Sequence, residues 1–351
     1  MKIEININNL VRENVKGLSP YSSARDEYVS DGSQMVFLDA NENPFENGVN
    51  RYPDPQQRSL KAVLAANKGV SSSQILLGNG SDEVLDLIFR AFCEPKEDNV
   101  ISLPPTYGMY KVLSYINNIE NREVLLTEDF QPNIAEIFKV KDEHSKLLFI
   151  CSPNNPTGNG ISSAIIRELL NRFHGLVVID EAYIDFSSDV SWITELSNYP
   201  NLIVTQTLSK AYGLAGIRLG ICFASEEIIA ILNKIKPPYN INELTQQRAL
   251  ERIEDLERVN KEVLAILKER DALYNVLGSI DFVEKIYPSD ANFILTKVDD
   301  ATKRYHQLLK AGIVVRNRTT QPLCENTLRF TVGTAKENKK LIKLLKKIDN
   351  Q

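Results

Sequence analysis

Short apolar runs alternate with longer amphipathic segments along most of the chain. From about residue 35 onward the runs are rich in Val, Ile and Leu and show no alternation with polar residues. This pattern is typical of strands buried on both faces, as in a mainly parallel sheet covered by helices. The predicted strands include residues 75–77, 100–103, 147–151, 176–179 and 202–205, and helices are predicted between them at 82–93 and 162–172. Such an order predicts an α/β fold.

The alternation ends near residue 235, where Lys236, Pro237 and Pro238 interrupt it, because proline lacks the amide hydrogen that a helix needs. The later elements are expected to be a long helix at 243–277, a strand at 292–296, a helix at 301–311, short strands at 313–315 and 328–332, and a terminal helix. We therefore expect an arm (1–34), a large domain (35–236) and a smaller α+β domain (237–351). The length of 351 residues fits about two domains at roughly 150 residues each.

Composition narrows the class of protein. The net charge of -5 argues against a general nucleic-acid or membrane-surface binder, which would normally be basic. No apolar run approaches the ~20 residues of a membrane span, and the first residues lack the apolar region of a secretory signal. The four cysteines form no C-x-x-C pair, which favours a reducing, cytoplasmic setting. Three scattered histidines give no convincing metal site.

Polar loops follow several of the predicted strands. In open α/β sheets, ligands bind beyond the carboxyl ends of the strands. The first loop, residues 78–83, has glycines that permit a tight turn, Ser81 as a candidate helix cap, and helix amides that favour a phosphate. The second loop contains Tyr107, an aromatic side chain that could stack on a planar ligand. The third loop, residues 152–158, has two prolines flanking two asparagines, which makes it rigid.

Two further strands lead into residues with more specific chemistry. Asp180 directly follows a buried run, where an acid is costly unless it has a partner, and a protonated pyridine nitrogen would be one. Tyr183, three residues on, could point at the same ring. Lys210 stands among small and hydroxyl-bearing residues, with Arg218 eight positions later. This pattern suits an imine-forming amine beside a phosphate site.

Taken together, these motifs resemble the fold-type-I aminotransferases, which use pyridoxal 5′-phosphate. The segments that carry the resemblance are SPNNPTG (152–158), DEAY (180–183) and TLSKAYGLAGIRLG (207–220). Other segments are similar to the histidinol-phosphate aminotransferase branch, in matching order over nearly the whole chain: LSPYSSAR, LDANENP, RYPDP, GNGSDE, PPTYGMY and LRFTVGT.

The resemblance implies a role for each matching residue around the cofactor ring. Lys210 would bind the cofactor as an imine and move a proton between the substrate Cα and the cofactor C4′. Asp180 would pair with the pyridinium nitrogen. Tyr183 and Asn155 would hydrogen-bond the phenolic oxygen, and Tyr107 would stack on the ring.

The resemblance also implies a phosphate cup and a substrate pocket, shared in a homodimer. The cup would consist of the backbone at Ser81 and Asp82, the hydroxyls of Thr207 and Ser209, Arg218, and Tyr52 of the other subunit. The substrate would meet Tyr21 in the arm, Asn41 and Arg329, the family's carboxylate-binding arginine. Either Arg316 or Arg318 could also face the substrate, and Arg316 is preferred because it ends the predicted strand at 313–315.

The activity implied is transfer of an amino group between L-histidinol phosphate and 2-oxoglutarate, giving imidazole acetol phosphate and L-glutamate in histidine biosynthesis. Two alternatives keep Lys210 and Asp180: an aromatic amino-acid aminotransferase, and an amino-acid-phosphate decarboxylase such as serves cobalamin synthesis. A transcription regulator with an aminotransferase-like domain is disfavoured, because the chain is acidic and leaves no room for a DNA-binding module before residue 35.

Overall fold

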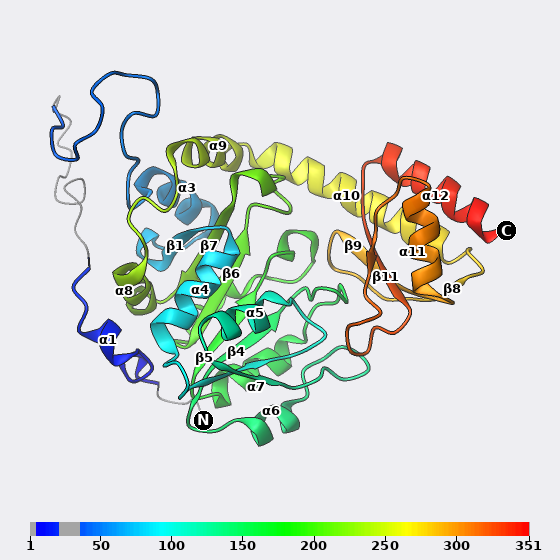
Figure 1. Ribbon diagram of the computed structural model, residues 1–351, viewed down its shortest axis with the longest axis horizontal. Helices are drawn as coiled ribbons and strands as arrows, with labels where there is room; N and C mark the ends of the chain where they lie inside the picture. The colour runs from blue at the N-terminus through cyan, green and yellow to red at the C-terminus, as the bar shows by residue number, and fades with distance from the viewer. Residues whose placement is uncertain (1–4, 21–35, 351) are drawn as a thin grey trace.

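A seven-stranded sheet forms the centre of the computed structural model, which describes residues 5–20 and 36–350 (Figure 1). The strand order is β1-β7-β6-β5-β4-β2-β3. The strands are β1 (Ile75–Asn79), β2 (Asn99–Ser102), β3 (Glu120–Glu123), β4 (Ser145–Cys151), β5 (Leu176–Asp180), β6 (Leu202–Thr207) and β7 (Leu219–Ala224). The predicted α/β fold is confirmed, and the five predicted strands correspond to β1, β2, β4, β5 and β6.

One strand of this sheet, β7, runs against the other six. It pairs antiparallel with both β1 and β6, whereas the pairs from β6 to β3 are parallel. The sequence analysis predicted neither β7 nor β3, which is a polar edge strand. Because β7 starts at the edge where the other strands end, the residue before it, Arg218, lies at that edge.

Helices cover both faces of the sheet and bury alternate strand residues. Leu76 and Val178 face one apolar core, whereas Leu77 and Val177 face the other. On the first face lie α1 (Glu13–Lys16), α4 (Ser81–Phe92), α5 (Met109–Ile116) and α8 (Glu226–Ile235). On the second lie α3 (Arg58–Lys68), α6 (Ile134–Val140), α7 (Ser163–Arg172) and α9 (Glu243–Glu254). Short 3₁₀ turns complete the chain: η1 (Ile7–Asn9), η2 (Ser72–Gln74), η3 (Ile184–Phe186), η4 (Trp192–Glu195) and η5 (Ala215–Ile217).

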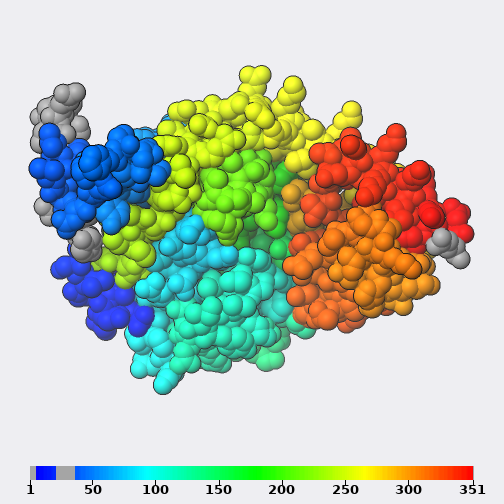
Figure 2. Space-filling view, turned by 45° about the horizontal axis from the view of Figure 1, so that its top comes forward, coloured from blue at the N-terminus to red at the C-terminus, as the bar shows by residue number. Residues whose placement is uncertain are grey.

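The C-terminal part builds a second, antiparallel sheet in the order β10-β11-β9-β8. Its elements are α10 (Leu256–Leu277), β8 (Val283–Ile286), β9 (Phe293–Val298), α11 (Ala301–Lys310), β10 (Arg316–Asn317), β11 (Thr327–Thr331) and α12 (Ala335–Asp349). These elements enclose a third apolar core, and Figure 2 shows the strands and helices after α10, in orange and red, gathered at one end of the molecule.

Two predictions about this part were wrong. The strand expected at 313–315 is replaced by β10, which begins one residue later. The long helix at 243–277 is two helices, because Asp255 leaves helical geometry and its carboxylate accepts a hydrogen bond from the amide of Arg258. The helix α10 connects the cores, since Val259 packs with the large one and Leu273 with the small one. The domain boundary at residue 236 stays a prediction.

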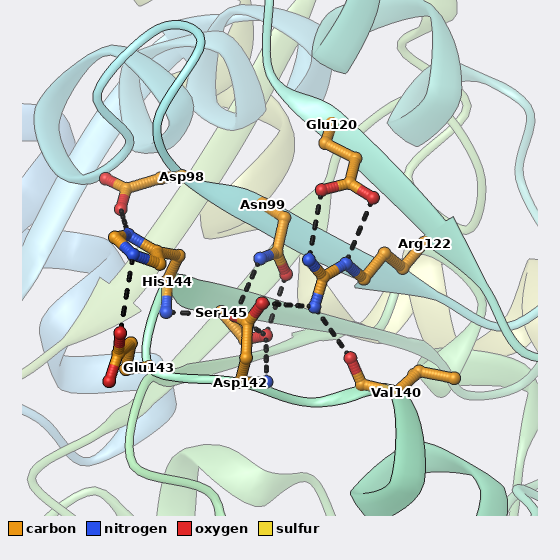
Figure 3. A network of polar contacts seen from close by, with 9 residues as sticks. All are labelled: Asp98, Asn99, Glu120, Arg122, Val140, Asp142, Glu143, His144 and Ser145. Atoms are coloured by element: carbon orange, nitrogen blue, oxygen red, sulfur yellow. Dashed lines mark hydrogen bonds and ion pairs between the residues drawn. The ribbon is translucent and has the colours of Figure 1, made fainter.

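A polar network ties together the amino ends of β2, β3 and β4 (Figure 3). The Arg122 guanidinium contacts Asp142 at 2.7 Å and donates to the Val140 carbonyl at 2.7 Å. Asp142 also accepts a hydrogen bond from Asn99 at 2.9 Å. Although burial opposes it, bonding by Asn99 and Arg122 holds the pKa of Asp142 well below its ordinary value. This network fixes the sheet at the edge away from the carboxyl ends.

None of the described helices is both long and apolar enough to cross a membrane.

Candidate active site

A cavity of about 450 Å³ opens at the carboxyl ends of the large sheet. The loops after β1, β2, β4, β5 and β6 and the residue before β7 contribute to its wall, and so does the second sheet. The predicted residues that line it are Ser81, Asp82, Tyr107, Asn155, Asp180, Tyr183, Thr207, Ser209, Lys210, Arg218, Arg316 and Arg329. Loops far apart in the sequence are thus brought to one place, because parallel strands end at a common edge, and the second sheet adds Arg316 and Arg329.

Two predicted residues that the structure describes do not line this cavity within the chain. Asn41 and Tyr52 line a separate hollow of about 410 Å³. Tyr52 is 50% exposed, and its ring stacks on Tyr239 with the centroids 4.5 Å apart. Tyr21 lies outside the described residues. The service of Tyr52 to the phosphate cup of a second subunit stays a prediction, and so do the substrate contacts of Tyr21 and Asn41.

Asp180, the last residue of β5, is held by two donors. Its Oδ2 accepts a hydrogen bond from the Tyr110 hydroxyl at 2.8 Å, and its Oδ1 accepts one from the Ala182 amide at 3.1 Å. Burial raises the pKa of Asp180. The two hydrogen bonds oppose this shift, because they stabilise the ionised form. A carboxylate that is only 3% exposed calls for a cation, and a protonated ring nitrogen in the cavity would supply it.

Lys210 follows β6 in a tight turn, in which the Gly213 amide donates to its carbonyl at 3.0 Å. Burial and the positive charges of Arg329 and Arg218 lower the pKa of the Lys210 amine, while Asp180 opposes them. The amine lies 5.6 Å from the centre of the Tyr183 ring. A lowered pKa gives more of the neutral amine, which is the form that attacks a carbonyl carbon.

The start of α4 offers free amides for an anion. The sequence suggested that Ser81 caps this helix, but this prediction was wrong. Ser81 is the first helical residue, and the N-cap is Gly80, which provides no side-chain acceptor. Gly80 has a φ of 83°, and a Cβ there would lie 2.6 Å from Nη2 of Arg218. Opposite these amides, the Thr207 and Ser209 hydroxyl oxygens are 3.0 Å apart. The uncapped amides, hydroxyls and guanidinium suit a phosphate group.

An acidic side chain also borders this cup. The Asp82 carboxylate accepts a hydrogen bond from the Tyr107 hydroxyl at 3.0 Å and lies 3.7 Å from Nη2 of Arg218. The contact fixes the Tyr107 ring at the cavity wall. Burial, with the charge of Asp82, raises the pKa of Tyr107 well above its ordinary value, so the phenol stays a donor.

Three arginines converge on the cavity from the second sheet. Arg316 and Arg329 are directly opposite each other in β10 and β11, and the Arg318 amide donates to the Thr327 carbonyl at 2.9 Å. Since side chains two positions apart share a face, all three lie on the same side of this sheet. Both Arg316 and Arg318 line the cavity, and the preference for Arg316 as the one that faces the substrate stays a prediction.

These arginines are not neutralised by any acid in residues 5–20 or 36–350. No ion pair joins them to a carboxylate there, and the Nε atoms of Arg318 and Arg329 are buried without a partner. Burial and the charge of Arg318 lower the pKa of Arg329 to about 10. One Nη1 hydrogen bond, to Oδ1 of Asn155, holds Arg329 in place. Like charges directly opposite in a sheet are destabilising, so this arrangement favours binding of an anion.

The sequence analysis missed Tyr110, which does not line the cavity but hydrogen-bonds Asp180 from behind. It is fully buried in α5 and stacked on Phe149, so its pattern is that of a core residue. The available signal was its place in the PPTYGMY motif, three residues after Tyr107. Within the described ranges, no group of three or more His, Cys, Asp or Glu side chains could hold a metal ion.

Comparison with known proteins agrees with this geometry. The family model for class I and II aminotransferases matches residues 33–345. A histidinol-phosphate aminotransferase from Flavobacterium johnsoniae is 67% identical, over 97% of this chain and 98% of its own length. The crystal structure of the histidinol-phosphate aminotransferase from Clostridium acetobutylicum is similar, with a TM-score of 0.80 and 26% sequence identity over 86% of this chain and 91% of that one. One from Sinorhizobium meliloti, in complex with pyridoxal-5′-phosphate, shares the fold at a TM-score of 0.77, with 22% identity over 86% of this chain and 83% of that one. The chain therefore belongs to the class I and II aminotransferases, within the histidinol-phosphate aminotransferase branch.

Proposed function

We propose that this protein transfers an amino group between L-histidinol phosphate and 2-oxoglutarate, using pyridoxal 5′-phosphate. The observation that carries the proposal is the group of three unneutralised arginines in the same cavity as Lys210 and Asp180. Histidinol phosphate ends in a dianionic phosphate and has no carboxylate, whereas glutamate and 2-oxoglutarate carry two carboxylates. A guanidinium binds either kind of anion through paired hydrogen bonds, so one arginine group serves both substrates. The name of the 67% identical relative supports the same substrate.

The residues present fit the proposed cofactor. Asp180 would hold the protonated ring nitrogen, and the amides at Ser81 and Asp82 would hold the phosphate together with Thr207, Ser209 and Arg218. The cofactor supplies an electron sink for the bond broken at the substrate Cα. Lys210 would bind it covalently, and its Nζ would then move the proton between Cα and C4′.

The remaining ring contacts follow from the same placement. Because Oδ1 of Asn155 is occupied by Arg329, the amide nitrogen of Asn155 is the group that would donate to the cofactor's phenolic oxygen. Tyr183 would donate to the same oxygen, since burial raises the pKa of its hydroxyl and keeps it protonated. Tyr107 would cover the face of the ring.

The active sites are proposed to be shared in a homodimer. Tyr52 is half exposed and lies apart from the cavity of its own chain, so its phenol is available to the phosphate cup of a partner. Asn41 and Tyr21 would likewise reach the substrate, together with Arg329 and Arg316. All four cysteines are free and buried, which supports the proposed cytoplasmic location.

Substrate assays separate the proposal from its two alternatives. We expect histidinol phosphate to be consumed with 2-oxoglutarate, with one glutamate formed per turnover. An aromatic aminotransferase would instead favour phenylalanine, which has no phosphate to occupy the arginines. A decarboxylase would release CO₂ from an amino-acid phosphate without forming glutamate. A preference for phenylalanine, or release of CO₂, would refute the proposed substrate while leaving the cofactor assignment intact.

A further inference from the structure

Tyr110 holds the side of Asp180 that the backbone does not. Its hydroxyl donates to Oδ2 at 2.8 Å, and both residues are almost completely buried. Its ring is clamped between aromatic neighbours: it stacks on Phe149 at 4.7 Å between centroids and meets the edge of Tyr107 at 5.6 Å. The hydroxyl therefore has a fixed position.

The phenol can act only as a donor to this carboxylate. Burial, and then the negative charge of Asp180, raises the pKa of Tyr110 well above its ordinary value, so the hydroxyl keeps its proton. A hydrogen bond donated to a carboxylate stabilises its ionised form and makes the carboxylate a weaker base. Without this bond, the Ala182 amide would be the one remaining donor that the structure places on Asp180.

The basicity of Asp180 matters because a base in a dry cavity competes for the proton of its partner. If Asp180 is the weaker base, the proton stays on the ring nitrogen and the ring carries a positive charge. If Asp180 is the stronger base, the proton moves to the carboxylate, and a neutral carboxylic acid faces a neutral ring. Burial raises the pKa of Asp180, which favours the second, inactive arrangement.

We propose that Tyr110 is a positioning residue that keeps the shared proton on the cofactor's ring nitrogen by hydrogen-bonding Asp180. The inference rests on the proposed function, because it requires the cofactor ring to face Asp180. It assigns separate roles to two residues of that site. Asp180 forms the ion pair with the ring nitrogen, and the Tyr110 hydroxyl keeps the proton on the nitrogen rather than on the carboxylate.

The direct test is nitrogen NMR of the holoenzyme loaded with pyridoxal 5′-phosphate that carries ¹⁵N in the ring. In the wild-type protein we expect the chemical shift of a protonated pyridine. In Tyr110→Phe, which keeps the ring and its stacking on Phe149, we expect the shift to move toward the unprotonated value. The pH midpoint of the cofactor's visible absorbance should move as well. An identical nitrogen shift in both proteins overturns the proposal.

Tyr107→Phe is the matched control. It also removes one phenol hydroxyl next to the site, but that hydroxyl donates to Asp82 rather than to Asp180. We expect the ring nitrogen of this variant to stay protonated. If Tyr107→Phe shifts the nitrogen as much as Tyr110→Phe does, the effect is a general loosening of the cavity and the proposal is wrong.

A cofactor analogue whose ring nitrogen is replaced by carbon gives a second test. With the natural cofactor, Tyr110→Phe should slow the glutamate half-reaction by roughly tenfold or more, since a hydrogen bond to a charged group is worth about one pKa unit or more. With the analogue, there is no ring proton to position, so variant and wild type should react equally slowly. A loss of the same size with both cofactors would show a merely structural role.

Two further results are possible: failure of the wild type to bind the cofactor at Lys210, and failure of Tyr110→Phe to fold. If the wild type binds no cofactor at Lys210, the proposed function itself fails, and this is seen before any variant is compared. If Tyr110→Phe does not fold, 3-fluorotyrosine at position 110 replaces it, because its more acidic hydroxyl keeps the shape and is a stronger donor. The pH midpoint of the visible absorbance should then move to lower pH, which is opposite to the shift expected from the weaker donation in Tyr110→Phe. An unchanged midpoint overturns the proposal.

Discussion

Lys210 and Asp180 are perturbed by the same cause in opposite directions. Burial lowers the pKa of the amine and raises that of the acid, so each is driven toward its neutral form. Neither shift is useful to the folded chain alone. Both become useful beside a ring that takes an imine at one position and a proton at another.

The first prediction concerns Lys210. Borohydride treatment of the holoenzyme should fix the cofactor to this residue, because reduction turns an imine into a stable amine. Lys210→Ala should still bind the cofactor through the phosphate cup but lose at least roughly 100-fold in turnover, the size of a lost proton-transfer group. Peptide mapping after reduction is the measurement, and a label on any other lysine would contradict the assignment.

The second prediction concerns Arg329, which we expect to serve both half-reactions. Arg329→Ala should lower kcat/KM for histidinol phosphate and for glutamate, because a buried anion loses its partner. The lost transition-state stabilisation should be roughly 2–4 kcal/mol for each substrate. Single-turnover rates of each half-reaction check this. Tyr21→Phe is the contrast, since it should weaken histidinol phosphate more than glutamate. Damage confined to the glutamate half would mean that Arg316 or Arg318 holds the phosphate.

At the scale of elements, the direction of β7 decides where the phosphate cup lies. Gly220 is paired with Gly78 across β1 and β7, and a Cβ on Gly220 would lie 2.3 Å from the amide of Ser81. Only glycine therefore allows this strand to approach the start of α4. The close approach brings Arg218 and the free amides to the same phosphate.

The third prediction follows from that contact. Gly220→Ala should push the first turn of α4 away, which costs roughly 1–3 kcal/mol of stability, as overpacking does, and weakens cofactor binding. Urea unfolding and the cofactor dissociation constant are the measurements. Gly216→Ala is the control, because a Cβ there meets nothing within 4 Å. Equal behaviour of the two variants would show that the close approach at Gly220 does not matter.

Two of the elements that the sequence analysis missed, β3 and β10, share a physical feature. The strand β3 is a polar edge strand of four residues, and β10 has only two residues, so neither has an apolar pattern to detect. The break at Asp255 is a local hydrogen bond inside a region of helical periodicity. Most of the buried strands were predictable, because burial on both faces requires continuous apolar runs. The strand β7 also has such a run, yet it was missed.

At the scale of the whole molecule, the cavity has two kinds of wall. One comes from the carboxyl edge of the large sheet, and the other from the arginines of the second sheet. The helix α10 packs with both cores, so the two sheets are connected through one rigid element. A third contribution, Tyr52, is proposed to come from another subunit.

The fourth prediction tests that contribution. Tyr52→Ala and Lys210→Ala should each be nearly inactive alone, yet regain activity when unfolded together and refolded. In a mixed dimer, one site would have both intact residues, so random pairing should restore about a quarter of the sites. Absence of any recovery, with mixed dimers shown by mass spectrometry, would refute sharing through Tyr52.

The sequence by itself determined the fold class and most of the polar residues that line the candidate cavity. Continuous apolar runs marked the strands, and each was followed by the residue types that its loop chemistry requires, because parallel strands place such loops at one edge. Only the tertiary structure decided that Tyr110 bonds Asp180, that Gly80 rather than Ser81 caps α4, and that Arg316, Arg318 and Arg329 face the cavity together. These features depend on strand direction, cross-strand register and helix packing, which bring together residues whose relation is not encoded in their spacing.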